Sequence, residues 1–420
     1  MIKRKLLNNL IDHLSKKEIT MIVGPRQAGK TTVMQLMMGE VKKKRQKALF
    51  LNLDFDEERQ FFSSQLKLLK KIELEIGKKG GFVFIDEIQR LDDAGLFLKG
   101  LYDRNLPYKF IVSGSGSVEL KEKIHESLAG RKQIFELSTL SFEEFVNYKT
   151  NYRYQEKLNL LFELEPEKTD VFLEEYLNLG GYPRVVIAEN LTEKRMVIDE
   201  IYQSYIMRDI GYLLQVQKID SYSKLIRALA AQIGNSVSYN ELAKTVGISL
   251  PTVSNYLWYG EKTFILRKLT PFFSNPRKEI TKSPLYYFYD LGFRNYALGL
   301  FGQLSRKDDY GFIFENMVLN IILDNIRYTG ATVHYWRTKD GAEVDFVINY
   351  GDRLLPIEVK YKRLEKPYIS RSFNNFIVKY KPSDAILVNL SLEIEENIGD
   401  TRVNYIPFYR LPEILALPEV

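Results

Sequence analysis

Short runs of apolar residues in the first 150 positions of the chain predict a buried β-sheet. Each run ends in glycine or in polar residues, which is typical of parallel strands covered on both faces. The expected strands span residues 19–23, 48–54, 81–87 and 109–117. Residues 32–38 follow the first run without a helix breaker, so we expect a helix there. This alternation predicts an α/β domain with a parallel sheet over residues 1–150.

The middle of the chain has a helical pattern. Residues 155–215 are rich in leucine, glutamate, tyrosine and lysine at helical spacing, with a break at the Gly-Gly-Tyr-Pro sequence of residues 180–183. Residues 236–270 then predict a winged helix-turn-helix. Ser238 would cap its first helix, Gly247 would form the turn, and residues 264–269 would form the wing.

The last third returns to strand patterns. A helix is expected over residues 311–319, and strands are expected from residue 334, over 341–348 and over 355–360. Strand alternation places Glu343 and Asp345 on one face, and Glu358 and Lys360 on one face of the next strand. The expected domains are therefore an α/β domain at 1–150, a helical segment or linker at 151–215, a winged helix at 216–275 and a second α/β domain at 276–420.

Composition narrows the class of protein. The chain has 420 residues, of which 45% are hydrophobic and 27% charged, an ordinary globular balance. It contains no cysteine, which excludes disulfides and thiolate metal sites and favours a cytoplasmic location. Because no run approaches the roughly 18 apolar residues of a membrane span, we expect no membrane partner. The three histidines, His13, His125 and His334, lie too far apart in sequence to suggest a metal cluster.

Positive charge is concentrated in two places. Residues 1–50 hold twelve Lys and Arg against three Asp and Glu, and residues 351–382 hold eight against three. Such patches attract phosphate backbones, so DNA is an expected partner. However, no Lys or Arg lies between Thr245 and Glu261, where the recognition helix is expected. Because DNA-reading helices normally supply such contacts, a structural or protein-binding role is the stronger hypothesis for this helix.

Residues 24–31 read Gly-Pro-Arg-Gln-Ala-Gly-Lys-Thr, which matches the phosphate-binding loop G-x-x-x-x-G-K-[ST]. The loop joins a strand to a helix N-terminus, where backbone N–H groups and the helix dipole favour an anion. Lys30 is expected to reach the β- and γ-phosphates of ATP, and the Thr31 hydroxyl to hold Mg²⁺. The expected nucleotide-binding residues are Gly24, Pro25, Arg26, Gln27, Ala28, Gly29, Lys30, Thr31 and Thr32.

Acidic and small polar residues follow the other strands of the predicted sheet. Asp86 is expected to hold Mg²⁺ through water, and Glu87 to orient or deprotonate the attacking water. Ser113 either senses the γ-phosphate or belongs to a Gly/Ser turn. Asp54 is a weaker candidate for the metal or water shell, because strand carboxyl ends line the ligand crevice of such sheets.

A second constellation lies near the C-terminus. Asp345 on one strand, followed by Glu358-x-Lys360 on the next, resembles the PD-(D/E)xK arrangement of restriction-enzyme-like nucleases. The carboxylates of Asp345 and Glu358, with that of Glu315 as a further candidate, would bind Mg²⁺. Lys360 would orient or deprotonate the attacking water. The alternative is an acidic β-hairpin with a surface lysine.

The series of motifs resembles one family over essentially the whole chain: bacterial and archaeal AAA-type ATPases with a C-terminal domain of uncharacterised function. The motifs are the phosphate-binding loop, Phe-Ile-Asp-Glu-Ile-Gln, Ser-Gly-Ser, Leu-Ala-Gly-Arg at 128–131 and Leu-Ser-Phe-Glu-Glu-Phe at 140–145. The resemblance implies a helical lid, and an arginine that stabilises charge on the γ-phosphate. Arg131 fits that role, in its own subunit or in a neighbour's, and Arg26 is the alternative.

Two functions are compatible with these observations. The first is an AAA-type ATPase that couples ATP hydrolysis to DNA binding or to metal-dependent DNA cleavage by its C-terminal domain. The second is an ATP-driven switch or adaptor whose C-terminal half binds a protein partner and does not cut DNA. AAA-type enzymes often form rings, so a homo-oligomer is one expectation, although no residue of this sequence specifies it.

Overall fold

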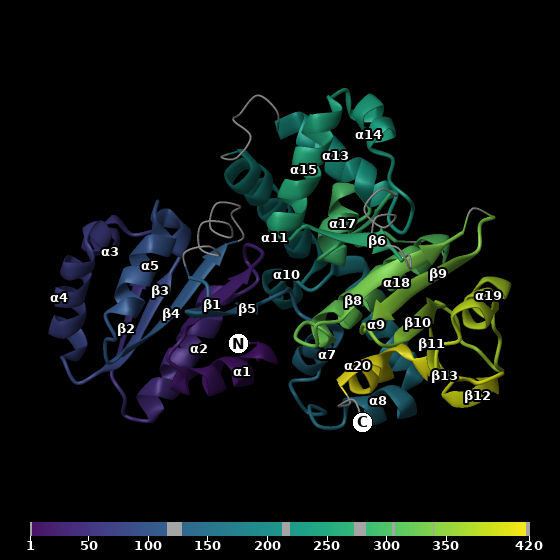
Figure 1. The fold of residues 1–420 in the computed structure, drawn as a ribbon, viewed down its shortest axis with the longest axis horizontal. Coiled ribbons are helices and arrows are strands. Elements are labelled where there is room, and N and C mark those ends of the chain that lie inside the picture. Colours follow the sequence, from purple (N-terminus) through teal and green to yellow (C-terminus); the bar gives the residue numbers. More distant parts are fainter. Residues whose placement is uncertain are drawn as a thin grey trace. The chain divides into compact units, whose positions relative to one another are not determined.

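The protein folds into two compact units that are interleaved in sequence. The computed structural model describes residues 2–115, 128–211, 219–272, 283–304, 307–338 and 340–416. Unit 1 comprises Met1–Asn151, Gly181–Ile219 and Leu257–Ile265, and unit 2 comprises Tyr152–Gly180, Asp220–Tyr256 and Leu266–Val420 (Figure 1). No helix among the described residues is long and apolar enough to cross a membrane.

Unit 1 is built on a five-stranded sheet in the order β2-β3-β4-β1-β5. The strands are β1 (Ile19–Gly24), β2 (Ala48–Asn52), β3 (Gly81–Asp86), β4 (Tyr108–Ser115) and β5 (Lys132–Glu136). All four neighbouring pairs are parallel, as the apolar runs predict. The carboxyl ends of β1, β3 and β4 therefore meet at one edge of the sheet.

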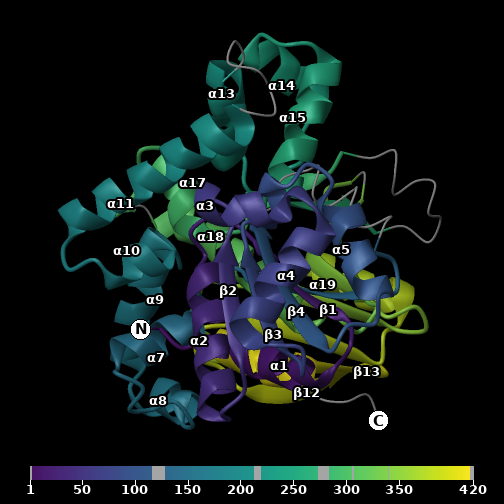
Figure 2. The same cartoon turned by 90° about the vertical axis from the view of Figure 1, so that its left-hand side faces the viewer.

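Helices cover both faces of this sheet. On one face, α1 (Leu6–Asp12) and α2 (Lys30–Lys43) bury apolar side chains such as Leu10, Val33 and Met37 against strand residues that include Ile22 and Phe84. The other face is covered by α4 (Gln65–Ile76) and α5 (Ala94–Asp103) (Figure 1; Figure 2). The short α3 (Asp56–Arg59) precedes α4, and α7 (Phe142–Lys149) follows β5.

The later segments of unit 1 are helical. They form α10 (Pro183–Ile187), α11 (Leu191–Ser204) and the π-helical turn η4 (Tyr205–Ile210). Pro183 occupies the start of α10, where its missing N–H is no loss. The helical segment expected at 151–215 is thus shared, because 152–180 pack in unit 2 and 181–219 in unit 1.

Unit 2 contains an eight-stranded mixed sheet in the order β12-β13-β11-β10-β9-β8-β6-β7. The strands are β6 (Leu266–Pro271), β7 (Leu285–Phe288), β8 (Thr332–Arg337), β9 (Glu343–Asn349), β10 (Leu354–Val359), β11 (Asp384–Asn389), β12 (Ile394–Ile398) and β13 (Thr401–Pro407). Strands β8, β9 and β10 are antiparallel neighbours, whereas β10, β11 and β13 run parallel. Helix α19 (Arg371–Tyr380) packs Phe373, Phe376 and Ile377 against this sheet.

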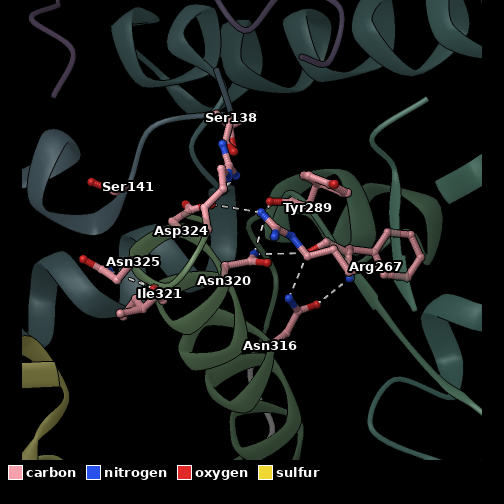
Figure 3. A network of polar contacts seen from close by, with 12 residues as sticks. Ser138, Ser141, Arg267, Tyr289, Asn316, Asn320, Ile321, Asp324 and Asn325 are labelled. Carbon is pink, nitrogen blue, oxygen red and sulfur yellow. Dashed lines mark hydrogen bonds and ion pairs between the residues drawn. The ribbon is translucent and has the colours of Figure 1, made fainter. Parts of the chain in front are cut away.

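Helix α18 (Lys307–Asn325) is fixed to the β6–β7 side of the sheet by a buried polar network (Figure 3). The guanidinium of Arg267 lies 4.0 Å from the ring centroid of Tyr289 and pairs with Asp324 at 3.2 Å. Asn316 accepts the Phe288 N–H and donates to the Phe288 carbonyl, both at 2.8 Å. These contacts tie α18 to β6 and to the end of β7.

Helices form at both positions expected for a helix-turn-helix, but the expected wing belongs to a larger sheet. Helices α13 (Ile219–Ala231), α14 (Tyr239–Val246) and α15 (Leu250–Lys262) follow in order, with Gly247 in the left-handed conformation at the turn. Strand β6 pairs with β7 and also with β8, so the wing expected at 264–269 is not a separate hairpin. The loop between β6 and β7 lies largely outside the described residues.

Short helices complete unit 2: α8 (Leu158–Leu164), α9 (Pro166–Leu179), α17 (Leu291–Ala297) and α20 (Leu411–Ala416). Helices α9 and α17 meet at two glycines. A β-carbon at Gly180 would lie 2.4 Å from the backbone nitrogen of Gly292, and Gly180 has a φ of 72°. Glycine is therefore required at Gly180, both for its backbone conformation and for the close approach of α17.

Candidate functional site

The phosphate-binding loop closes tightly around the N-terminus of α2. Gly24 has a φ of 155°, and a β-carbon there would lie 2.1 Å from the Leu137 carbonyl. Gly29, with a φ of 97°, is the N-cap of α2. The buried ammonium of Lys30 donates to the carbonyls of Gly24 at 3.0 Å and Pro25 at 2.8 Å. Lys30 is thus held over the loop, where it can meet phosphate oxygens.

Helix α2 and strands β3 and β4 bring polar side chains together beside this loop. The Thr31 hydroxyl donates to one carboxylate oxygen of Asp86 at 2.6 Å. The Ser113 hydroxyl donates to the other oxygen, which also accepts the Glu87 N–H at 3.1 Å. Asp86 and Ser113 are both fully buried, and Ser113 lies within β4, so it is not part of a turn. A hydroxyl and a carboxylate beside a phosphate loop are the oxygen ligands that Mg²⁺ prefers, so these residues fit that ion.

Glu87 leaves the strand in an unusual conformation. Its φ of 56° and ψ of 44° are left-handed, so β3 ends at Asp86, one residue earlier than expected. Burial raises the pKa of Glu87 and the nearby Asp86 adds to this effect, whereas Lys30 opposes it. Gln89 donates to its carboxylate. A carboxylate with a raised pKa beside the loop has the properties of a general base.

A cavity of about 940 Å³ opens next to these groups. Its walls include residues 26–33 of the loop and α2, Glu87, and residues of α10, α11 and η4. Cavities of several hundred cubic ångströms suit cofactor-sized ligands. The apolar side chains of Ile187, Met196 and Met207 lie on the side contributed by the helices. The cavity therefore combines the phosphate loop with a helical wall of mixed apolar and charged side chains, among them Asp199 and Glu200.

Arg184 is a residue of this cavity that the sequence did not reveal as functional. Its guanidinium donates to the Gln27 side chain at 2.9 Å and to both carboxylate oxygens of Glu200, at 2.7 and 2.9 Å. The hydrogen bonds from Arg184 lower the pKa of Glu200. Arg184 follows the Gly-Gly-Tyr-Pro sequence, but it lies 157 positions from Gln27, and no local pattern predicts such a contact.

Two charged candidates for the nucleotide site form ion pairs with other side chains of unit 1. Arg131 precedes β5 at the amino edge of the sheet, where its carbonyl accepts the Ile19 N–H at 2.9 Å. Its guanidinium pairs with Asp103 at 2.7 Å. Arg131 is therefore not among the residues that line the cavity, whereas Arg26 is. Asp54 lies beyond the end of β2 and pairs with Arg90 at 2.7 Å, not with the Thr31–Asp86 pair.

The second constellation lies in unit 2. Ile357 on β10 pairs with Phe346 on β9, so Asp345 and Glu358 come next to each other where the ladder ends. Asp345 accepts the Val359 N–H at 2.7 Å. Glu358 is buried and pairs with Lys360 at 2.6 Å through one oxygen, while the other accepts the Ser370 hydroxyl at 3.0 Å.

Burial perturbs these acids strongly. It raises the pKa of Asp345 to about 7. Burial, and then the charge of Asp345, raise the pKa of Glu315 on α18, whose carboxylate accepts the Tyr287 hydroxyl. At Lys360, burial alone would lower the pKa. The negative charges of Glu358, Asp345 and Glu315 outweigh burial, so the pKa of Lys360 is raised. The sequence thus correctly placed four polar side chains near one another.

The binding of a metal ion by these residues stays a prediction. Within the described ranges, no group of three or more His, Cys, Asp or Glu side chains is positioned to hold a metal. Protein donors engage one oxygen each of Asp345 and Glu315 and both oxygens of Glu358. No catalytic step through Mg²⁺ follows from this site.

Family models match three segments of the chain. Residues 16–146 match a family described as AAA domain. Residues 171–304 and 310–411 match two domains of unknown function, DUF8612 and DUF4143. Residues 16–146 therefore carry an AAA-type domain, with a parallel five-stranded sheet consistent with P-loop nucleoside triphosphatases. This match supports ATP binding and hydrolysis in unit 1.

Similar proteins extend over most of the chain. The uncharacterized protein Rv2008c of Mycobacterium tuberculosis is 27% identical over 368 residues, covering 87% of this chain and 75% of its own. The uncharacterized protein MJ1544 of Methanocaldococcus jannaschii is 27% identical over 368 residues, covering 86% and 78%.

Solved structures with a partial likeness include two proteins with ligands. The Orc1 protein of Aeropyrum pernix in complex with DNA has a TM-score of 0.31 at 13% identity, covering 71% of this chain and 92% of its own. The AMPPCP-bound DnaA of Aquifex aeolicus has a TM-score of 0.28 at 16% identity, covering 62% and 87%. Likeness at this level carries no functional argument.

Proposed function

We propose that unit 1 is a Mg²⁺-dependent ATPase whose site is formed by the loop at residues 24–32 together with Asp86, Glu87 and Ser113. The observation that carries this proposal is the hydrogen bond between Thr31 and Asp86, 2.6 Å long, at the mouth of the phosphate loop. It joins the two side chains that the metal of such an ATPase requires, although they are 55 positions apart in sequence.

Each residue has a role that follows from its position. Lys30 and the loop N–H groups bind the phosphates, and Thr31 and Asp86 hold Mg²⁺. The ion supplies positive charge that neutralises the phosphate oxygens. Glu87 orients and deprotonates the attacking water, for which its raised pKa suits it. Ser113 positions Asp86 and senses the state of the phosphate end.

An arginine is expected to stabilise charge on the γ-phosphate. In its own chain, Arg26 and Arg184 are the candidates, because both line the cavity. Arg131 can take this role only on a neighbouring copy in a homo-oligomer. Arg184 would exchange its ion pair with Glu200 for the phosphate, which couples ATP binding to α11.

Loss of ATP turnover in the Lys30→Ala variant tests the ATPase proposal. We expect release of inorganic phosphate from ATP and Mg²⁺ to fall by about 100-fold or more, because a preorganised cation at the phosphates is removed. Lys43→Ala is the matched control, since Lys43 lies on the last turn of the same helix and pairs with Glu40 at the surface. Unchanged turnover in Lys30→Ala would overturn the proposal.

For unit 2 we propose, as a second candidate function, an action on DNA that ATP hydrolysis controls. Its support is the convergence of Asp345, Glu358, Lys360 and Glu315. The competing proposal is an adaptor that binds a protein partner. Two observations favour the adaptor. Protein donors engage the carboxylates of Asp345, Glu315 and Glu358. No Lys or Arg lies between Thr245 and Glu261.

A cleavage assay separates these two proposals. Wild type, Asp345→Ala and Lys360→Ala are incubated with linear DNA, ATP, and Mg²⁺ or Mn²⁺. A nuclease requires cutting by wild type that both variants lose. No cutting by wild type, or cutting that persists in both variants, excludes a nuclease role for this constellation and leaves the adaptor.

A further inference from the structure

Arg4 is a buried arginine outside every motif used so far. It precedes α1, is 9% exposed, and lies on the wall of the nucleotide cavity. One terminal nitrogen donates to the Ala28 carbonyl of the phosphate loop at 2.8 Å. The other donates to the carbonyls of Ser138 at 2.6 Å and Thr139 at 3.3 Å. The remaining nitrogen, Nε, pairs with Glu144 at 3.2 Å.

The contact with Ala28 bears on the conformation of the loop. In a trans peptide the carbonyl of one residue and the N–H of the next point in opposite directions. Because Arg4 holds the Ala28 carbonyl, the Gly29 N–H points away from Arg4. Gly29 is the N-cap of α2 in the left-handed conformation, so this peptide is the last one before the helix. Its N–H is one of the donors that a phosphate at a helix N-terminus accepts.

Glu144 holds Arg4 in place. Its carboxylate accepts the Lys5 N–H at 2.7 Å and the Ser141 N–H at 3.1 Å, in addition to Arg4. Ser141 and Glu144 form a capping box at the start of α7. This gives a physical role to the Leu-Ser-Phe-Glu-Glu-Phe motif, because its second acidic residue anchors the arginine that contacts the loop.

The residues just before α7 also contact the segment that begins at Gly181 and contributes a wall of the cavity. The Leu140 N–H donates to the Gly181 carbonyl at 2.8 Å, and a β-carbon on Gly181 would lie 2.3 Å from the Leu140 carbonyl. Two and three positions later, Pro183 and Arg184 line the cavity. The start of α7 therefore fixes both the phosphate loop, through Arg4, and the chain that leads to Arg184.

We propose that Arg4 is a positioning residue for nucleotide binding: it orients the Ala28–Gly29 peptide so that the Gly29 N–H meets the β-phosphate. Glu144 is the anchor that keeps Arg4 in this geometry. The proposal rests on the ATPase function proposed above and deepens it. Because the β-phosphate is common to ADP and ATP, Arg4 contributes equally to the affinity for both.

The test measures binding of ADP and of a non-hydrolysable ATP analogue to the full chain by titration calorimetry. The variants are Arg4→Met, Arg4→Lys and Glu144→Gln. A charge-assisted hydrogen bond corresponds to about 10- to 100-fold in an equilibrium constant, so Arg4→Met should weaken both nucleotides by that factor. Arg4→Lys keeps the charge but not the four contacts and should lose part of this affinity. Glu144→Gln should behave similarly.

Lys5→Met is the matched control, because Lys5 lies in the same segment, is exposed and pairs with Glu143. It should bind both nucleotides as wild type does. Thermal unfolding without nucleotide shows whether each variant is folded, and Arg4→Lys decides the question if Arg4→Met does not fold.

Three outcomes would overturn the inference. If folded variants lose thermal stability but keep their nucleotide affinity, Arg4 is only structural. If ATP-analogue binding falls and ADP binding does not, Arg4 acts on the γ-phosphate and not through Gly29. If Lys5→Met weakens binding as much as Arg4→Met, the effect belongs to the segment as a whole. Failure of wild type to bind either nucleotide would instead refute the ATPase proposal, so the two failures are distinguishable.

Discussion

The two edges of the five-stranded sheet in unit 1 both carry buried polar residues, but they are organised differently. At the carboxyl edge, Thr31, Asp86 and Ser113 bond to one another across strands and face the phosphate loop. At the amino edge, the buried Lys109 donates to the Glu18 carbonyl, and the ion pair of Arg131 with Asp103 is partly exposed. Charge in a buried position is therefore not sufficient for a site; convergence of several side chains on one loop distinguishes the functional edge.

The largest effect on ATP hydrolysis is expected at the carboxyl edge, for Glu87→Gln. The amide cannot accept the proton of the attacking water, so kcat for ATP hydrolysis should fall by about 100- to 10,000-fold. ATP affinity should remain within a fewfold of wild type, because the phosphate contacts are kept. Phosphate release and nucleotide titration measure the two quantities. Glu57→Gln, an exposed residue of α3, should change neither. A loss of affinity equal to the loss of kcat would assign Glu87 to binding instead.

A smaller effect is expected for Arg184→Ala. Removing a guanidinium at the phosphate end of the cavity should lower kcat/KM for ATP by about 10- to 100-fold. ADP binding should change little, because the proposed contact is with the γ-phosphate. Arg195→Ala, which changes an exposed arginine of the following helix α11, should match wild type. Equal weakening of ADP and ATP would contradict a role at the γ-phosphate.

Changes at the amino edge should alter the free energy of unfolding but not the rate of ATP hydrolysis. Burial, with the nearby charge of Lys109, lowers the pKa of His13 to about 4. The folded-state pKa is thus below that of the unfolded chain, so the stability that His13 contributes is complete above about pH 6.5 and is lost as the pH falls toward 4. His13→Gln removes this linkage.

Urea unfolding at pH 7 and pH 5 measures the effect. Between these values, wild type should lose up to about 1 kcal/mol more stability than His13→Gln, because solvent screens the charge of this partly exposed imidazole. ATP turnover at pH 7 should be the same in both proteins, because His13 contacts Thr20 and Lys109 at the edge opposite the loop. A parallel fall in stability for both proteins would show that His13 is not the linked group.

Local patterns predicted much of unit 1. The apolar runs predicted β1 to β4 but not β5, and the glycine loop predicted the start of α2 within two residues. Asp86, Thr31 and Lys30 came together because strand carboxyl ends in a parallel sheet share one edge. The Asp345–Glu358 spacing predicted adjacent strands for the same kind of reason, since a short turn joins them.

Contacts between segments far apart in the chain could not be predicted from local sequence patterns. Arg4, Arg184 and Glu144 reach the cavity or its supports from positions up to 157 residues from the loop. The interleaving of the units depends on close approaches such as that of Gly180 to Gly292, which no periodicity encodes. The carboxylates of unit 2 were placed correctly, but their engagement by Tyr287, Ser370 and the Val359 N–H depends on tertiary packing.

The smallest change in kcat is expected for a variant at the amino edge, and it tests the difference between the two edges directly. Arg131→Ala should leave kcat for ATP within about twofold in dilute protein, because an exposed ion pair with Asp103 contributes little and does not reach the loop. The measurement is phosphate release over a range of protein concentrations, with light scattering to follow association. A loss of activity that grows as copies associate would instead place Arg131 at a neighbour's γ-phosphate, and the amino edge of one copy would then complete the carboxyl edge of another.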